Sequence, residues 1–171
     1  MPQPTRRPVP LILLAGYDIF AGCVALALPA VVTWRVLSAG DALTGLSVLF
    51  GSYFLLVAVA HIAAGYWILN RSPKGWHLTL GVQCWDVAFN VIKLFGGNPA
   101  VGGDPHHAAP ARYAVRALIA GAWAFYVLQP HIMDFFGLDP AQKSRYLKRI
   151  LGVVIGLVVM INLVLHLLGA A

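Results

Sequence analysis

The residues best suited to chemistry lie in one polar stripe within an apolar segment. They recur at spacings of three and four, which places them on one face of a helix: Trp76, Thr79, Gln83, Asp86, Asn90 and Lys93. A carboxylate that faces lipid at the bilayer centre costs about 2.5 to 3.5 kcal/mol, so this stripe is expected to face protein or water. There it could line a polar cavity for protons or a small solute, or it could join helices.

Asp86 requires a counter-ion if it is charged at this depth. It lies eleven residues past Gly75, which is roughly 16 Å along a helix and near the bilayer midplane. Arg116, in the next apolar segment, comes within about 6 Å of the same depth. We therefore predict an ion pair between Asp86 and Arg116, with Lys93 as the competing partner on the same stripe.

A second polar pair is predicted between the first two apolar segments. Asp18 and His61 each lie eight residues from the same end of their segments, about 12 Å from one membrane face, so they could touch if these helices pack as antiparallel neighbours. A histidine in a membrane helix also suits axial ligation of haem or chlorophyll. Hydrogen bonding between helices is the simpler interpretation of His61, and no cofactor is predicted.

Weaker patterns suggest a metal site and a helix contact. His106 and His107 follow Asp104 in a Gly/Pro-rich loop, but adjacent histidines on an extended chain point in different directions, which disfavours a metal site. Gly152 and Gly156 form a Gly-xxx-Gly pair that would permit close approach of another helix. The sequence contains no recognisable nucleophile and base, phosphate loop or paired carboxylates, so we expect a protein that is not an enzyme.

The amino-acid composition indicates that the helices carrying these residues lie in lipid and not in water. Of the 171 residues 60% are hydrophobic and 11% charged, and mean hydropathy is +0.78, which is too apolar for a water-soluble globule. The net charge is +6, and the Lys and Arg residues lie mainly at the ends of apolar runs. This distribution is typical of lipid headgroup contact and not of nucleic-acid binding. We predict a single all-α membrane domain with five transmembrane helices, four being the alternative, over residues 9–37, 43–69, 76–95, 111–129 and 150–168.

The segment between the last two spans, residues 130–149, is predicted to lie at the membrane interface. Its apolar residues are expected along that interface: Ile132, Met133, Phe135 and Phe136. Asp139 as N-cap, Pro140 at the first helical position and Gln142 at the third form a helix-start signature. The last helix should therefore begin before it enters lipid.

The distribution of Lys and Arg predicts the orientation. With a cytoplasmic N-terminus, eight of the twelve lie on the cytoplasmic side (Arg6, Arg7, Arg71, Lys74, Lys143, Arg145, Lys148 and Arg149) and four lie opposite (Arg35, Lys93, Arg112 and Arg116). The positive-inside rule thus favours an N-terminus in the cytoplasm and a C-terminus outside it, in a multi-pass protein of the bacterial inner membrane.

Three functions are consistent with this sequence. The favoured one is a non-catalytic accessory or assembly subunit of a larger inner-membrane complex of respiratory or photosynthetic type, whose partners are the lipid bilayer and other membrane subunits or further copies of the chain. The alternative is a small transporter or ligand-binding protein with a polar cavity around Asp86. The third is haem or pigment binding through His61.

Overall fold

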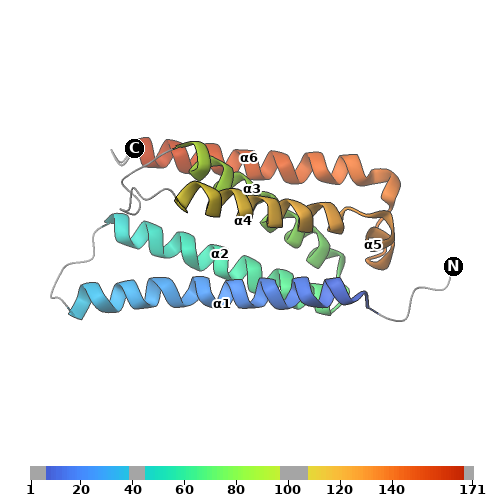
Figure 1. Cartoon of the computed structure of the whole chain (residues 1–171), viewed down its shortest axis with the longest axis horizontal. Helices are drawn as coiled ribbons and strands as arrows, with labels where there is room; N and C mark the ends of the chain where they lie inside the picture. Colours follow the sequence, from blue (N-terminus) through green and yellow to red (C-terminus); the bar gives the residue numbers. More distant parts are fainter. Residues whose placement is uncertain (1–6, 39–44, 97–107, 168–171) are drawn as a thin grey trace. The chain divides into compact units, whose positions relative to one another are not determined.

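The computed structural model describes residues 7–38, 45–96 and 108–167, and every regular element in these ranges is helical. The elements are α1 (Val9–Ser38), α2 (Gly45–Leu69), α3 (Pro73–Gly96), α4 (Ala108–Val127), α5 (Pro130–Phe135), η2 (Pro140–Gln142) and α6 (Lys143–Leu167) (Figure 1). The five predicted segments thus correspond to α1, α2, α3, α4 and α6. Residues 43, 44 and 168 of these predictions lie outside the described residues.

Among the described residues, three helices are long and apolar enough to cross a membrane, over Val9–Arg35, Gly51–Leu69 and Pro73–Phe95. The structure is therefore that of an all-helical protein with candidate membrane spans in α1, α2 and α3. α4 is not among them, and it carries Arg112 and Arg116 within its 20 residues. α6 is not among them either; it begins with a basic segment, and the side chains of its last turn are not described.

The chain divides into two compact units, Met1–Thr79 and Leu80–Ala171, and α3 continues from the first into the second. In the first unit α1 and α2 lie side by side along much of their length (Figure 1). Their contact buries small and aliphatic side chains: Leu11, Leu14, Ala15, Ala58, Ala64 and Ile68. This helix pair also carries two buried polar residues, Asp18 on α1 and His61 on α2.

A short turn joins α2 to α3. The backbone N–H of Ser72 donates to the carbonyl of Trp67 over 3.0 Å, and that of Arg71 donates to the carbonyl of Ile68 over 3.1 Å, which is the Schellman pattern of a helix end. Arg71 adopts φ 52°, in the left-handed region. Ser72 then accepts the N–H of Lys74 at its Oγ over 3.3 Å and so caps α3, which explains why α3 begins at Pro73, three residues before the predicted start.

In the second unit α3 and α4 pack antiparallel. The ammonium of Lys93, near the end of α3, lies 5.6 Å from the ring centroid of Tyr113, near the start of α4. Further along, a Cβ added at Gly121 would meet Cγ2 of Val87 at 3.9 Å, which is ordinary van der Waals contact. These two contacts define the register of the pair.

The segment after α4 contains the short helix α5 and several buried apolar residues. Gln129 is extended, Pro130 occupies the first turn of α5, and Gly137 at φ 69° closes that helix. The four apolar residues expected along the interface, Ile132, Met133, Phe135 and Phe136, are buried by the chain itself. The expected position of this segment at the membrane interface stays a prediction.

The predicted start signature of the last helix is present in modified form. The Asp139 carboxylate accepts the backbone N–H of Ala141 over 2.9 Å and Nε2 of Gln142 over 3.2 Å. The capped residues form the 3-10 turn η2, and α6 follows directly at Lys143. α6 thus begins seven residues before the predicted apolar span at residue 150.

Candidate functional site: a buried aspartate and histidine pair

The first unit brings together Asp18 of α1 and His61 of α2, as the antiparallel arrangement predicted. Oδ1 of Asp18 lies 3.4 Å from Nδ1 of His61, a long but significant hydrogen bond or ion pair. Asp18 is 0% exposed and His61 is 5% exposed. A titratable pair is therefore buried, with one partner on each of two membrane-type helices.

Two glycines allow the helices to come close enough for this pair to form. Gly22 lies one turn after Asp18, and a Cβ there would stand 2.8 Å from the carbonyl oxygen of Ala58. Gly65 lies one turn after His61, and a Cβ there would stand 2.6 Å from the carbonyl oxygen of Ala15. Each polar residue is thus followed four positions later by a glycine that touches the other helix, so close backbone contacts flank the pair on both sides.

The geometry restricts what the pair can do chemically. A carboxylate on Nδ1 holds the imidazole in one orientation and favours the tautomer that carries a proton on that nitrogen. The proton can reside on either partner, so the pair can exist as a neutral hydrogen bond or as an ion pair. Because both side chains are buried, a solute from the aqueous phase does not reach them without local opening of the structure.

On α3 the predicted stripe is largely buried. Trp76 and Thr79, in the first unit, and Gln83, in the second, are fully buried, and Asn90 is buried as well. Asp86 is half-buried. Nδ2 of Asn90 donates to the backbone carbonyl of Asp86 over 2.7 Å, so this amide interacts with its own helix. The polar face is therefore turned mainly toward protein.

The predicted ion pair between Asp86 and Arg116 is not formed. Within the described ranges no ion pair joins them, and Arg116 is exposed. The register of α3 and α4 places Arg116 at the level of residues 90–92, about 6 to 9 Å along the helix from Asp86. Counting residues gave an approximate depth for each side chain but not the direction in which it points.

Lys93 interacts with aromatic rings. Its ammonium lies 4.5 Å from the ring centroid of Phe89, one turn earlier on α3, and 5.6 Å from that of Tyr113 on α4. Such cation–π contacts contribute about 0.5 to 1 kcal/mol at exposed sites and more when desolvated. Lys93 therefore helps to join α3 and α4 and was wrongly considered as a counter-ion for Asp86.

The remaining predicted residues fall into two groups. His106 and His107 lie outside the described residues, and within the described ranges no group of three or more His, Cys, Asp or Glu side chains could hold a metal ion. Gly152 and Gly156 of α6 are exposed, and a Cβ at either position would meet nothing within 4 Å. This surface of α6 is open to whatever lies outside the chain.

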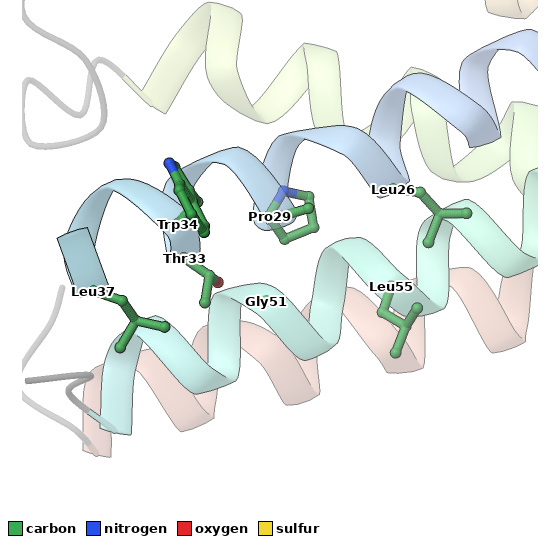
Figure 2. A pocket seen from close by; sticks show the side chains of 8 residues that line it. Leu26, Pro29, Thr33, Trp34, Leu37, Gly51 and Leu55 are labelled. Carbon is green, nitrogen blue, oxygen red and sulfur yellow. The ribbon is translucent and has the colours of Figure 1, made fainter.

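An apolar groove lies further along the contact of α1 and α2 (Figure 2). Its volume is about 420 Å³, and it is lined by Leu26, Pro29, Ala30, Thr33, Trp34 and Leu37 of α1 and by Gly51 and Leu55 of α2. Trp34, at 75% exposed, stands at the edge of the groove. The sequence analysis did not identify this groove, although Pro29 within α1 marks the region where it forms.

Gly22 and Gly65 were also missed. The signal that could have found them is their common spacing of four residues from Asp18 and His61. No family model, no curated protein and no solved structure matches this chain.

Proposed function

We propose that this chain is a multi-pass protein of the bacterial inner membrane with five spans, an N-terminus in the cytoplasm and a C-terminus outside it. In this arrangement α4 and α6 join α1, α2 and α3 as spans. The four-residue Lys and Arg excess on the cytoplasmic side supports the orientation. The exposure of large apolar side chains on every long helix supports a lipid environment.

Within that membrane we propose that the chain serves as a non-catalytic accessory or assembly subunit of a larger complex of respiratory or photosynthetic type. The observation that carries this proposal is the enclosure of the Asp18–His61 pair between Gly22 and Gly65. A sealed polar pair flanked by close backbone contacts joins two helices and offers little access to a substrate. Asn90 and Lys93 likewise make contacts that stabilise the fold.

The experiment is to remove the chain from its host and to follow the membrane complexes in mild detergent by native electrophoresis. A tagged copy is expected to migrate with one large complex, and its loss should reduce the amount of that complex while the complex's individual subunits are still synthesised. Restoring the chain should restore assembly. A tagged chain that migrates alone, in cells whose complexes are unchanged by its loss, contradicts the proposal.

A small transporter or ligand-binding protein is the second candidate, and the half-burial of Asp86 between buried Gln83 and Asn90 on one helix supports it. In purified chain reconstituted into vesicles, Asp86→Asn should then abolish flux or binding while the helical content is unchanged. Asp139→Asn, outside the proposed spans, is the matched control. Unchanged activity in Asp86→Asn would remove this residue from the mechanism.

Haem or pigment binding through His61 has a separate test in the same preparation. The Asp18 carboxylate on Nδ1 is the arrangement that orients a ligating histidine, with Nε2 as the ligating atom. A bound macrocycle would colour the purified chain, His61→Ala would abolish the colour, and Asp18→Asn would shift the absorption bands. A colourless preparation from its native host contradicts this function.

A further inference from the structure

One face of α6 combines three exposed cations with two open glycines. At 100° per residue, Arg145, Lys148, Arg149, Gly152 and Gly156 fall within about 100° of arc around the helix. All five are exposed. The cations occupy the first two turns of the helix, and the glycines follow on the same face where the sequence becomes apolar.

The cations on this face are available for an external anion. Within the described ranges none of the three has a carboxylate within ion-pair distance. The nearest carboxylate before them in sequence, that of Asp139, already accepts hydrogen bonds from Ala141 and Gln142. Arg145 and Arg149 are four residues apart and therefore neighbours on the helix surface, where their planar guanidinium groups suit bidentate binding of phosphate.

Below the cations, Gly152 and Gly156 leave a strip of the helix surface without side chains, which we call the trough. A Cβ at Gly152 or Gly156 would meet nothing within 4 Å among the residues that the structure describes, which leaves this surface open. Val153 and Ile155, at 64% and 60% exposed, flank the trough on its two sides. Gly152 and Gly156 lie about 4.5 and 10 Å beyond Arg149 along the helix, which is the depth at which an acyl chain lies beneath its phosphate.

We infer that this face of α6 is a binding site for an anionic phospholipid. Arg145, Lys148 and Arg149 bind its phosphate, and its first acyl segment lies in the trough over Gly152 and Gly156. The inference rests on the proposed fifth span, because that span places Arg149 at the headgroup level. The charge of the headgroup distinguishes this site from the general lipid surface of the other helices.

The test uses the full chain, purified in a nonionic detergent and stripped of lipid, with lipid binding read by native mass spectrometry. The probes are dioleoyl phosphatidylglycerol and dioleoyl phosphatidylcholine, which share their acyl chains and differ in charge. The wild-type chain should bind the anionic lipid at least tenfold more tightly, and increasing salt should weaken only that binding. Each cation near an anionic lipid contributes about fivefold, so three contribute on the order of 100-fold.

Two sets of variants locate the site. The triple variant Arg145→Gln, Lys148→Gln and Arg149→Gln should lose the preference for the anionic lipid. The charge-matched control Arg35→Gln, Arg112→Gln and Arg116→Gln removes three exposed cations elsewhere and should retain the preference within about twofold. The double variant Gly152→Leu and Gly156→Leu should bind dioleoyl phosphatidylglycerol severalfold more weakly. Its binding of dihexanoyl phosphatidylglycerol should be unchanged, because only the longer acyl chains reach the trough.

Several outcomes overturn the inference. Equal binding of the two lipids by the wild-type chain contradicts the headgroup site, and this measurement does not depend on the folding of any variant. An equal loss of the anionic-lipid preference in the control triple variant indicates that the net charge of the chain attracts the lipid without a specific site. A dimeric wild type that becomes monomeric in the glycine variant, with lipid binding unchanged, assigns the face to contact between two copies of the chain. A complex with another subunit can still assemble if the lipid site fails, so the two proposals are tested separately.

Discussion

Replacing Gly65 with alanine should loosen the contact of α1 and α2 that encloses the Asp18–His61 pair. The added Cβ would stand 2.6 Å from the carbonyl oxygen of Ala15, whereas ordinary contact begins at 3.4 Å. The two helices must therefore separate or tilt by about 0.8 Å at this point. The obstacle is backbone, which cannot rotate away as a flexible side chain can.

This displacement has two measurable consequences. Overpacking of this kind costs about 1 to 3 kcal/mol, against a gain of about 1 kcal/mol because alanine favours the helix over glycine. The Asp18–His61 distance is already 3.4 Å, close to the upper limit of a hydrogen bond, so a further separation of this size would break the interaction. Loss of packing and loss of the polar contact should therefore occur together.

The matched control is Gly51→Ala, in the same helix, where an added Cβ would meet nothing within 4 Å. Reversible unfolding in mixed micelles, followed by far-UV circular dichroism, should show Gly65→Ala to be less stable than Gly51→Ala by about 1 to 3 kcal/mol. The ring ¹⁵N shifts of His61 should change only in Gly65→Ala. Equal stabilities together with an unchanged His61 signal would refute the close-contact reasoning.

Three further predictions concern other parts of the chain. Asp18→Asn and His61→Ala should each lower the free energy of unfolding by about 1 to 3 kcal/mol, and the double variant should lose less than their sum, as measured by a double-mutant cycle in micelles. Met133→Ala should cost about 2 to 5 kcal/mol, because Met133 is 0% exposed, whereas Met160→Ala, at 54% exposed, should be nearly neutral by the same unfolding assay. Asp139→Ala should cost about 0.5 to 2 kcal/mol by removing a helix cap, and hydrogen exchange should increase in the first turn of α6 while the middle of that helix is unaffected.

The long helices and the Asp18–His61 contact were predictable because both follow from fixed geometry. A helix rises 1.5 Å per residue, so two residues equally far from the same end of antiparallel helices reach the same depth. The failed pair of Asp86 and Arg116 shows the limit of this reasoning. Depth is only one coordinate, and the register of α3 and α4 together with the outward direction of Arg116 decided the outcome.

Other features depended on contacts that a single sequence does not specify. Gly22 and Gly65 are unremarkable by composition, and their role is visible only against the backbone of the opposite helix. Ile132 and Phe136 could have faced lipid or protein, since both environments favour apolar side chains. The local cap at Asp139 was predictable because it needs only residues within its own turn.

The turn between α2 and α3 limits where its positively charged residues can lie. Three residues, Asn70 to Ser72, connect the helices. Arg71 adopts the left-handed backbone conformation, which is costly for any residue that has a Cβ. With so little connecting chain, the end of α2 and the start of α3 stay beside each other. In the proposed membrane topology, Arg71 and Lys74 therefore lie together on the cytoplasmic side, where the positive-inside rule favours them.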